Sequence, residues 1–126
     1  MNVTVETVSG VFAVDLETEE VEPANGLFVE GLPVVSLPRL VASASTGSTV
    51  VAVVDASPPM LISHDAGVTW RESGRGLPRG RAVAIADDDP DLIVYASRNR
   101  LHLSRDGGRF WTSLAVELPE IRRVAL

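Results

Sequence analysis

Residues Ser63–Trp70 read Ser-His-Asp-Ala-Gly-Val-Thr-Trp, and a related stretch follows 41 positions later, at Ser104–Trp111, as Ser-Arg-Asp-Gly-Gly-Arg-Phe-Trp. Both stretches fit one template: serine, any residue, aspartate, any residue, glycine, any residue, threonine or an aromatic residue, tryptophan. A Leu-Pro pair keeps a similar step, because Leu37, Leu77 and Leu118 each precede a proline. Independent markers with a shared period of 40 to 41 residues indicate an internal repeat.

The most regular repeat unit, residues 81–120, contains four short strand patterns. The apolar run Ala82–Ala86 comes first, and the continuously apolar run Leu92–Ala96 is typical of a strand buried on both faces. Leu101–Ser104 alternates apolar and polar residues, and Phe110–Leu114 follows an Asp-Gly-Gly turn. No stretch longer than a turn shows a capped helical period. The unit is therefore predicted to be four antiparallel strands.

The repeat divides the chain into units of roughly residues 1–39, 40–80 and 81–120, followed by an extra strand at Ile121–Leu126. The first unit is degenerate, because an Asn25-Gly26 pair stands where the template should lie. Its four strands are expected at Asn2–Glu6, Val11–Val14, Glu19–Glu22 and Leu27–Glu30.

Composition excludes several classes of protein. Of the 126 residues, 45% are hydrophobic and only 5% aromatic, so the core must be built from Val, Leu, Ile and Ala. The net charge of −6 argues against a general nucleic-acid binder. The absence of cysteine excludes disulfides, thiolate metal sites and cysteine nucleophiles. No apolar run is long enough to span a membrane and the first residues lack a signal-peptide pattern, which favours a cytoplasmic protein.

The repeated template resembles the Asp-box, or BNR, repeat of sialidases, sortilin-like receptors and photosystem II assembly-factor-like propellers. The resemblance implies an all-β fold, a β-propeller segment of about three four-stranded antiparallel blades, with each box turning between the third and fourth strands. It also implies that the box is structural. The aspartates can accept backbone N–H bonds within their own turns, and the tryptophans can pack between blades. The box residues are Ser63, Asp65, Gly67, Thr69 and Trp70, and Ser104, Asp106, Gly108 and Trp111.

Three blades cannot close a ring, because propellers typically use about four to eight. Repeat units of this kind need neighbours to cover their faces. Two arrangements are open. Two copies can form a six-bladed ring, with Ile121–Leu126 completing the first blade of the partner, or the chain is a piece of a longer propeller. Because Met1 lies at a repeat boundary, a homo-oligomer is favoured, and the expected partner is a second copy.

Arginines are the candidate ligand-binding residues. Arg75, Arg79 and Arg98 lie in loops expected at one mouth of the propeller channel, and arginine suits carboxylate, sulfate or phosphate groups. Such arginines can also be solvated residues that balance Asp and Glu. The acidic run Asp87–Asp91 is expected to be a solvated turn in preference to a calcium site. No metal or cofactor is predicted.

No catalytic residue can be assigned. A sialidase-like enzyme needs an arginine triad and an activated tyrosine, but Tyr95 lies in an apolar strand and is expected in the core. His102 is expected to be packed and not catalytic, and no carboxylate pair of the glycosidase kind stands out. We therefore expect a non-enzymatic scaffold or binding module. A glycan-binding or sialidase-like glycoside hydrolase module is the alternative.

Overall fold

The computed structural model describes residues 1–25, 37 and 39–126, and their regular structure consists of short β-strands. The strands form three four-stranded antiparallel sheets, which we call the first, second and third blades. In spatial order the first blade contains β12 (Ile121–Ala125), β1 (Asn2–Thr7), β2 (Gly10–Asp15) and β3 (Val21–Pro23). The second contains β4 (Leu40–Thr46), β5 (Thr49–Val54), β6 (Met60–Ser63) and β7 (Arg71–Ser73). The third contains β8 (Ala82–Ala86), β9 (Asp89–Ala96), β10 (Leu101–Ser104) and β11 (Thr112–Ser113).

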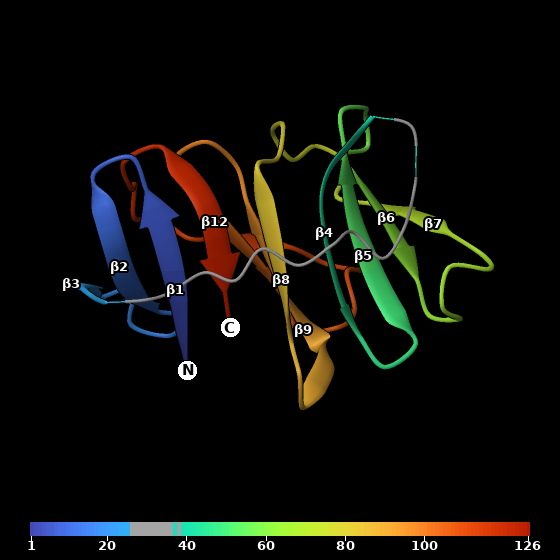
Figure 1. Ribbon diagram of the computed structural model, residues 1–126, viewed down its shortest axis with the longest axis horizontal. Helices are drawn as coiled ribbons and strands as arrows, with labels where there is room; N and C mark the ends of the chain where they lie inside the picture. Colours follow the sequence, from blue (N-terminus) through green and yellow to red (C-terminus); the bar gives the residue numbers. More distant parts are fainter. Residues whose placement is uncertain (26–36, 38) are drawn as a thin grey trace.

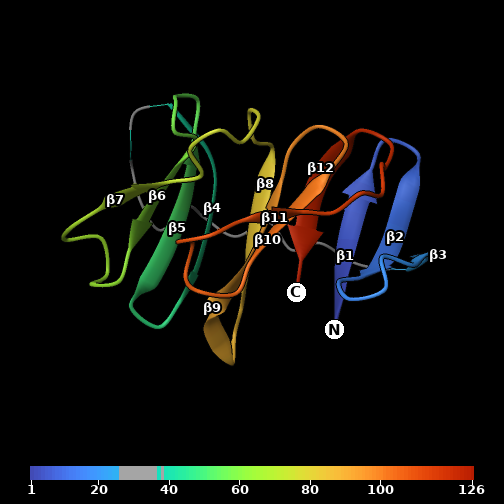
Figure 2. The ribbon, with the colours of Figure 1, turned by 180° about the vertical axis from the view of Figure 1, so that it is seen from behind.

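The third blade lies between the other two. Its strand β8 contacts β4 and β5 of the second blade on one side and β12 of the first blade on the other. Figures 1 and 2 show the first and second blades at opposite ends of the long axis. The three sheets thus form an arc of propeller blades, as the sequence predicts.

Alternation along β8 explains the central position of the third blade. Successive side chains of a strand point to opposite faces of the sheet. Ala82, Ala84 and Ala86 face a core shared with the first blade, whereas Val83 and Ile85 face a core shared with the second blade. All five side chains are buried. The third blade therefore covers apolar surface on both of its neighbours.

The first blade differs from its predicted strand order. Asn2–Glu6 was expected to be the first strand of its unit, but β1 is second in its sheet. The reason is that β12 pairs antiparallel with β1 and takes the inner position, with Val124 opposite Val5. The strand expected at Leu27–Glu30, Gly26 of the predicted Asn25-Gly26 turn and Pro38 of the Leu-Pro marker lie outside the described residues.

No helix long and apolar enough to cross a bilayer occurs in the described ranges 1–25, 37 and 39–126. The cytoplasmic location stays a prediction. The unit boundaries near residues 39, 80 and 120 also stay predictions, although the structure shows which strands share each sheet.

The junction between the second and third blades is held by polar as well as apolar contacts. The Trp111 indole Nε1 donates a hydrogen bond of 3.1 Å to Ser73 Oγ, which in turn donates to the carbonyl oxygen of Gly108. A Cβ added to Gly108 would lie 2.2 Å from Ile62 Cδ1 of the second blade, and the backbone there has φ of +90°. Only glycine allows this close approach.

Replacing Ser73 by alanine should weaken the junction between these blades. Ser73 is buried, and its loss leaves the Trp111 indole and the Gly108 carbonyl without this partner. We expect Ser73→Ala to lower the free energy of unfolding by about 1–3 kcal/mol, measured by urea denaturation. The control Ser9→Ala removes an exposed hydroxyl and should change it by less than about 0.5 kcal/mol. Equal effects of the two substitutions would contradict this role of Ser73.

Candidate functional site

The first repeated turn is closed by its own serine, aspartate and threonine. Ser63 Oγ donates to Asp65 Oδ1 at 2.7 Å and accepts from the Gly67 N–H at 2.8 Å. The Thr69 N–H donates to Asp65 Oδ1 at 2.8 Å, and the Thr69 hydroxyl donates to Asp65 Oδ2. Both carboxylate oxygens of Asp65 are therefore engaged inside the turn.

The second repeated turn has nearly the same network. Ser104 Oγ donates to Asp106 Oδ1 at 2.8 Å and accepts from the Gly108 N–H at 2.9 Å. The Phe110 N–H donates to the same Asp106 oxygen at 3.0 Å. Phe110 stands where the first turn has Thr69, so this aspartate lacks a hydroxyl donor at that position.

These bonds lower the pKa of both aspartates. Hydrogen bonds from the Thr69 hydroxyl, its N–H and Ser63 lower the pKa of Asp65 from 3.8 to about 2. The Phe110 N–H, followed by the Ser104 hydroxyl, lowers the pKa of Asp106. A carboxylate that accepts several hydrogen bonds is stabilised in its charged form. Both groups therefore stay charged at neutral pH, which suits a turn-forming role better than that of a proton donor.

The two box tryptophans have different surroundings. Trp111 packs edge-on against Tyr95, with ring centroids 6.1 Å apart, and bonds to Ser73 of the second blade. Trp70, at the equivalent position of the second blade, is half-buried on a flank without a neighbouring blade in the described part of the chain. A Cβ on Gly67 would meet only the Trp70 ring, at 3.5 Å. The repeated turn of the third blade therefore takes part in a blade junction, whereas in the described part of the chain the repeated turn of the second blade does not.

Basic residues gather at one end of the arc, which we call the loop face. It consists of the connectors 74–81 and 114–120 and the turns 55–59 and 97–100, which lie at the same end of the antiparallel sheets. Five of the eleven arginines lie here, against three acidic residues, in a chain of net charge −6. The arginines are Arg75, Arg79, Arg81, Arg98 and Arg100, and the acids are Asp55, Glu117 and Glu120. The opposite end carries the box aspartates and the acidic turn between β8 and β9.

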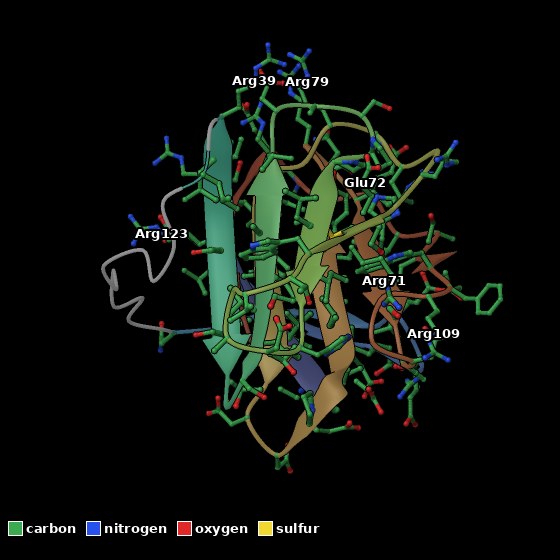
Figure 3. The ribbon with its side chains drawn as sticks, turned by 90° about the vertical axis from the view of Figure 1, so that its right-hand side faces the viewer. Arg39, Arg71, Glu72, Arg79, Arg109 and Arg123 are labelled. Atoms are coloured by element: carbon green, nitrogen blue, oxygen red, sulfur yellow. The ribbon has the colours of Figure 1, made fainter. Side chains whose placement is uncertain are left out.

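The loop face contains a hollow of about 540 Å³, which we call the arginine hollow. Its walls include Arg79 and Arg98, two of the three predicted anion-binding residues, together with Arg100, Asn99, His102 and Ser113. Arg75, the third predicted residue, does not line it. Arg75 lines a separate hollow of about 660 Å³ between β7 and the second box, with Arg71 and Arg109. Figure 3 shows Arg71 and Arg109 near each other there, with Arg79 at the distant loop face.

Ion pairs involve Arg79, Arg81, Arg98 and Arg100 of the loop face, and Arg81 lies 3.1 Å from Glu120. Arg79 lies 3.2 Å from Asp55, Arg100 lies 3.0 Å from Glu117, and Arg98 lies 3.7 Å from Glu120. The side chains of Arg79 and Asp55 are 83% and 51% exposed. Because exposed ion pairs contribute little net free energy, carboxylates of a ligand can replace these partners at low cost.

His102 forms the polar floor of the arginine hollow. Its Nδ1 lies 2.7 Å from Ser113 Oγ and its Nε2 lies 3.1 Å from Ser97 Oγ. Ser97 Oγ donates to the carbonyl oxygen of Arg100, which assigns the ring proton to Nε2. Burial, followed by the charge of Arg100, lowers the pKa of His102. His102 is therefore neutral at pH 7 and is held by two serines without a carboxylate.

The predicted core role of Tyr95 agrees with the structure. Tyr95 is fully buried, its hydroxyl donates to the carbonyl oxygen of Pro78, and burial raises its pKa to about 12. The acidic side chains of Asp87–Asp91 are exposed at the end opposite the loop face, but only Asp87 and Asp88 form the expected turn, because β9 begins at Asp89, which pairs with Ala86. The part of the chain that the structure describes has no cluster of three or more His, Asp or Glu positioned to hold a metal.

Sequence reasoning did not find Ser73 or Ser113. Ser73 lies three residues after Trp70, but the position three residues after Trp111 is Leu114, so the repeat marks neither serine. Ser73 gains its partner Trp111 only when the second and third blades pack together, and Ser113 meets His102 across the β10–β11 pair.

Comparison with known proteins shows the fold. A solved structure described as YCF48 bound to D1 peptide has a TM-score of 0.55 to this chain and 17% sequence identity. The similarity covers 93% of this chain and 37% of that one, so the present chain spans little more than a third of its neighbour's length. No protein-family model and no curated protein sequence matches the chain. At this identity the likeness establishes a β-propeller fold and nothing finer.

The first turn offers a test of its hydrogen-bond network. Thr69→Val removes the hydroxyl that contributes most to the low pKa of Asp65, so this pKa should rise from about 2 toward 3.8. Asp106, which has no hydroxyl donor at that position, is the internal control and should not change. NMR titration of the carboxyl carbons measures both values. An unchanged pKa of Asp65 would show that the Thr69 hydroxyl does not hold the turn.

The low pKa of Asp65 makes the stability of the folded protein depend on pH in the acidic range. The pKa of Asp65 is lower in the folded state, so its contribution to stability is complete above the unfolded value of 3.8 and is lost as pH falls through about 2.

Proposed function

We propose that this protein is a non-enzymatic β-propeller module of the Asp-box type that acts as a scaffold or binding unit. The two turns support the Asp-box interpretation, because each aspartate binds backbone N–H groups of its own turn. The chemistry of the loop face supports binding over catalysis, because its histidine is neutral and lacks a carboxylate partner.

We further propose that two copies join into a six-bladed ring. The observation that carries this proposal is the open flank of the second blade, which Figure 3 views directly. This flank presents the box turn with its Trp70 half-buried and Val68 and Val41 78% and 45% exposed. The equivalent turn of the third blade is covered by Ser73 and Ile62. In a ring of two copies, a first blade packed on the open flank would cover it in the same way.

The partner chemistry that suits the loop face is a carboxylate-bearing ligand, such as an acidic peptide segment. The loop face carries five arginines and only three acidic residues, although the net charge of the whole chain is −6. The structural neighbour was solved with a peptide, which supports a peptide ligand as a proposal for this chain.

The oligomeric state tests the ring. Light scattering on the purified chain of 13.4 kDa should give about twice that mass. Ser43 lies on the open flank, opposite Ala52 and on the other side of β4 from Ala42 and Ala44, which pack against the core shared with the third blade. Ser43→Arg should therefore convert the dimer to a monomer without unfolding it, whereas Ser9→Arg, in a turn of the first blade, should leave it dimeric. A wild-type monomer at all concentrations would reject the ring.

The loop face is tested with a glutamate hexapeptide as the probe. Replacing Arg79 and Arg98 together by glutamine should weaken its binding about tenfold or more, which is a loss of about 1.4 kcal/mol, as measured by NMR titration. The control Arg105→Gln changes an exposed arginine at the opposite, acidic end and should leave binding unchanged. Binding that is equally strong in all three proteins would reject this site.

A further inference from the structure

The connectors between blades do not all join strands of neighbouring blades. Eight residues join outer strand β7 to inner strand β8, and seven join β11 to β12. In both cases the two strands belong to neighbouring blades. Sixteen residues separate β3 from β4, and the third blade stands between the blades that contain them (Figure 2). Within one chain, the first and second blades are thus consecutive in sequence but separated in space.

We propose that in the assembled dimer β12 of each chain pairs with β1 of the partner subunit, so that each first blade contains strands from both chains. This inference rests on the proposed six-bladed ring. In the exchanged ring, β1–β3 lie beside the second blade of their own chain. Every connector then joins an outer strand to the inner strand of the next blade. Exchange of an identical element between copies is a low-cost route to a dimer.

The strand pairing that would be exchanged is already defined. Thr4 lies opposite Ala125 and Val5 opposite Val124, and the Val8 N–H donates to the Glu120 carbonyl oxygen at 2.9 Å. Glu6 and Arg123 also form an ion pair of 3.5 Å across these strands. The same contacts can form within one chain or between two. Exchange therefore keeps all of these contacts. The two arrangements differ in which blades each connector joins.

The open flank of the second blade is where the exchanged route places β1–β3 of the same chain. Gly108, at the junction of the second and third blades, approaches Ile62 so closely that a Cβ would clash. Gly67, in the same turn of the second blade, has only its own Trp70 nearby. In the exchanged ring the strands β1–β3 of the same chain lie on this flank. Consecutive blades would then be neighbours along the whole chain, as the second and third blades already are.

Cysteine cross-linking tests the exchange without background, because the chain has no cysteine. Thr4 and Ala125 are direct partners on adjacent strands, a spacing that a disulfide can bridge. Two single variants, Thr4→Cys and Ala125→Cys, are unfolded together, refolded and oxidised. Neither can form this disulfide within one chain. We expect a covalent dimer containing one of each variant on a non-reducing gel, and covalent dimers from the Thr4→Cys/Ala125→Cys double variant.

The control pair lies within one hairpin. Thr46 and Thr49 are partners on β4 and β5 of the second blade, on the side of the sheet that faces the third blade and not the open flank. Their double cysteine variant should cross-link only within one chain, and their mixed single variants should give no covalent dimer beyond background. If light scattering shows a dimer but the Thr4→Cys/Ala125→Cys variant cross-links only within one chain, the exchange is overturned and the proposed ring stands. If light scattering shows a monomer, the ring itself fails.

Discussion

The two-sided burial of β8 is the constraint on which this structure depends. The alanines of β8 pack in the core shared with the first blade, and its β-branched residues pack in the core shared with the second blade. The small side chains allow β12 to approach, and the larger ones fill the space toward β5 and β6. Because burying an aliphatic side chain contributes about 1.5–3 kcal/mol, each blade gains much of its stability from the blade beside it.

The repeated turn shows how one local structure serves two surroundings. In both copies a serine and an aspartate satisfy the backbone of the turn, so the hairpin does not need its neighbours for its shape. What differs is the outer side of the turn. At the third blade the glycine and tryptophan join the second blade through Ser73, whereas at the second blade a Cβ on the glycine would meet only the half-buried tryptophan of its own turn. The turn therefore has the same internal structure in both blades, and the contacts of a blade junction form only where a neighbouring blade packs against it.

The sequence predicted the fold well because its repeat encodes local geometry. Most strand positions of the third unit, the two repeated turns and the buried Tyr95 follow from short-range patterns. The position of β1 was not predictable, because pairing with a strand about 120 residues away leaves no local pattern. The same limit explains why Arg75 was grouped with Arg79 and Arg98. The sequence of a loop does not show which hollow an arginine side chain lines. In the structure Arg79 and Arg98 line one hollow and Arg75 lines another.

Charge is divided between the two ends of the arc, with arginines at the loop face and aspartates at the turns opposite. This division follows from strand direction, which brings alternate connectors to the same end of every sheet. Native-state hydrogen exchange measures most directly whether the blades depend on shared cores. The slowest amides should be those of Val94 and Tyr95 in the central third blade, with β3 and β7 exchanging fastest. Equal protection in all three blades, or slowest exchange in an end blade, would contradict an arc held together from its centre.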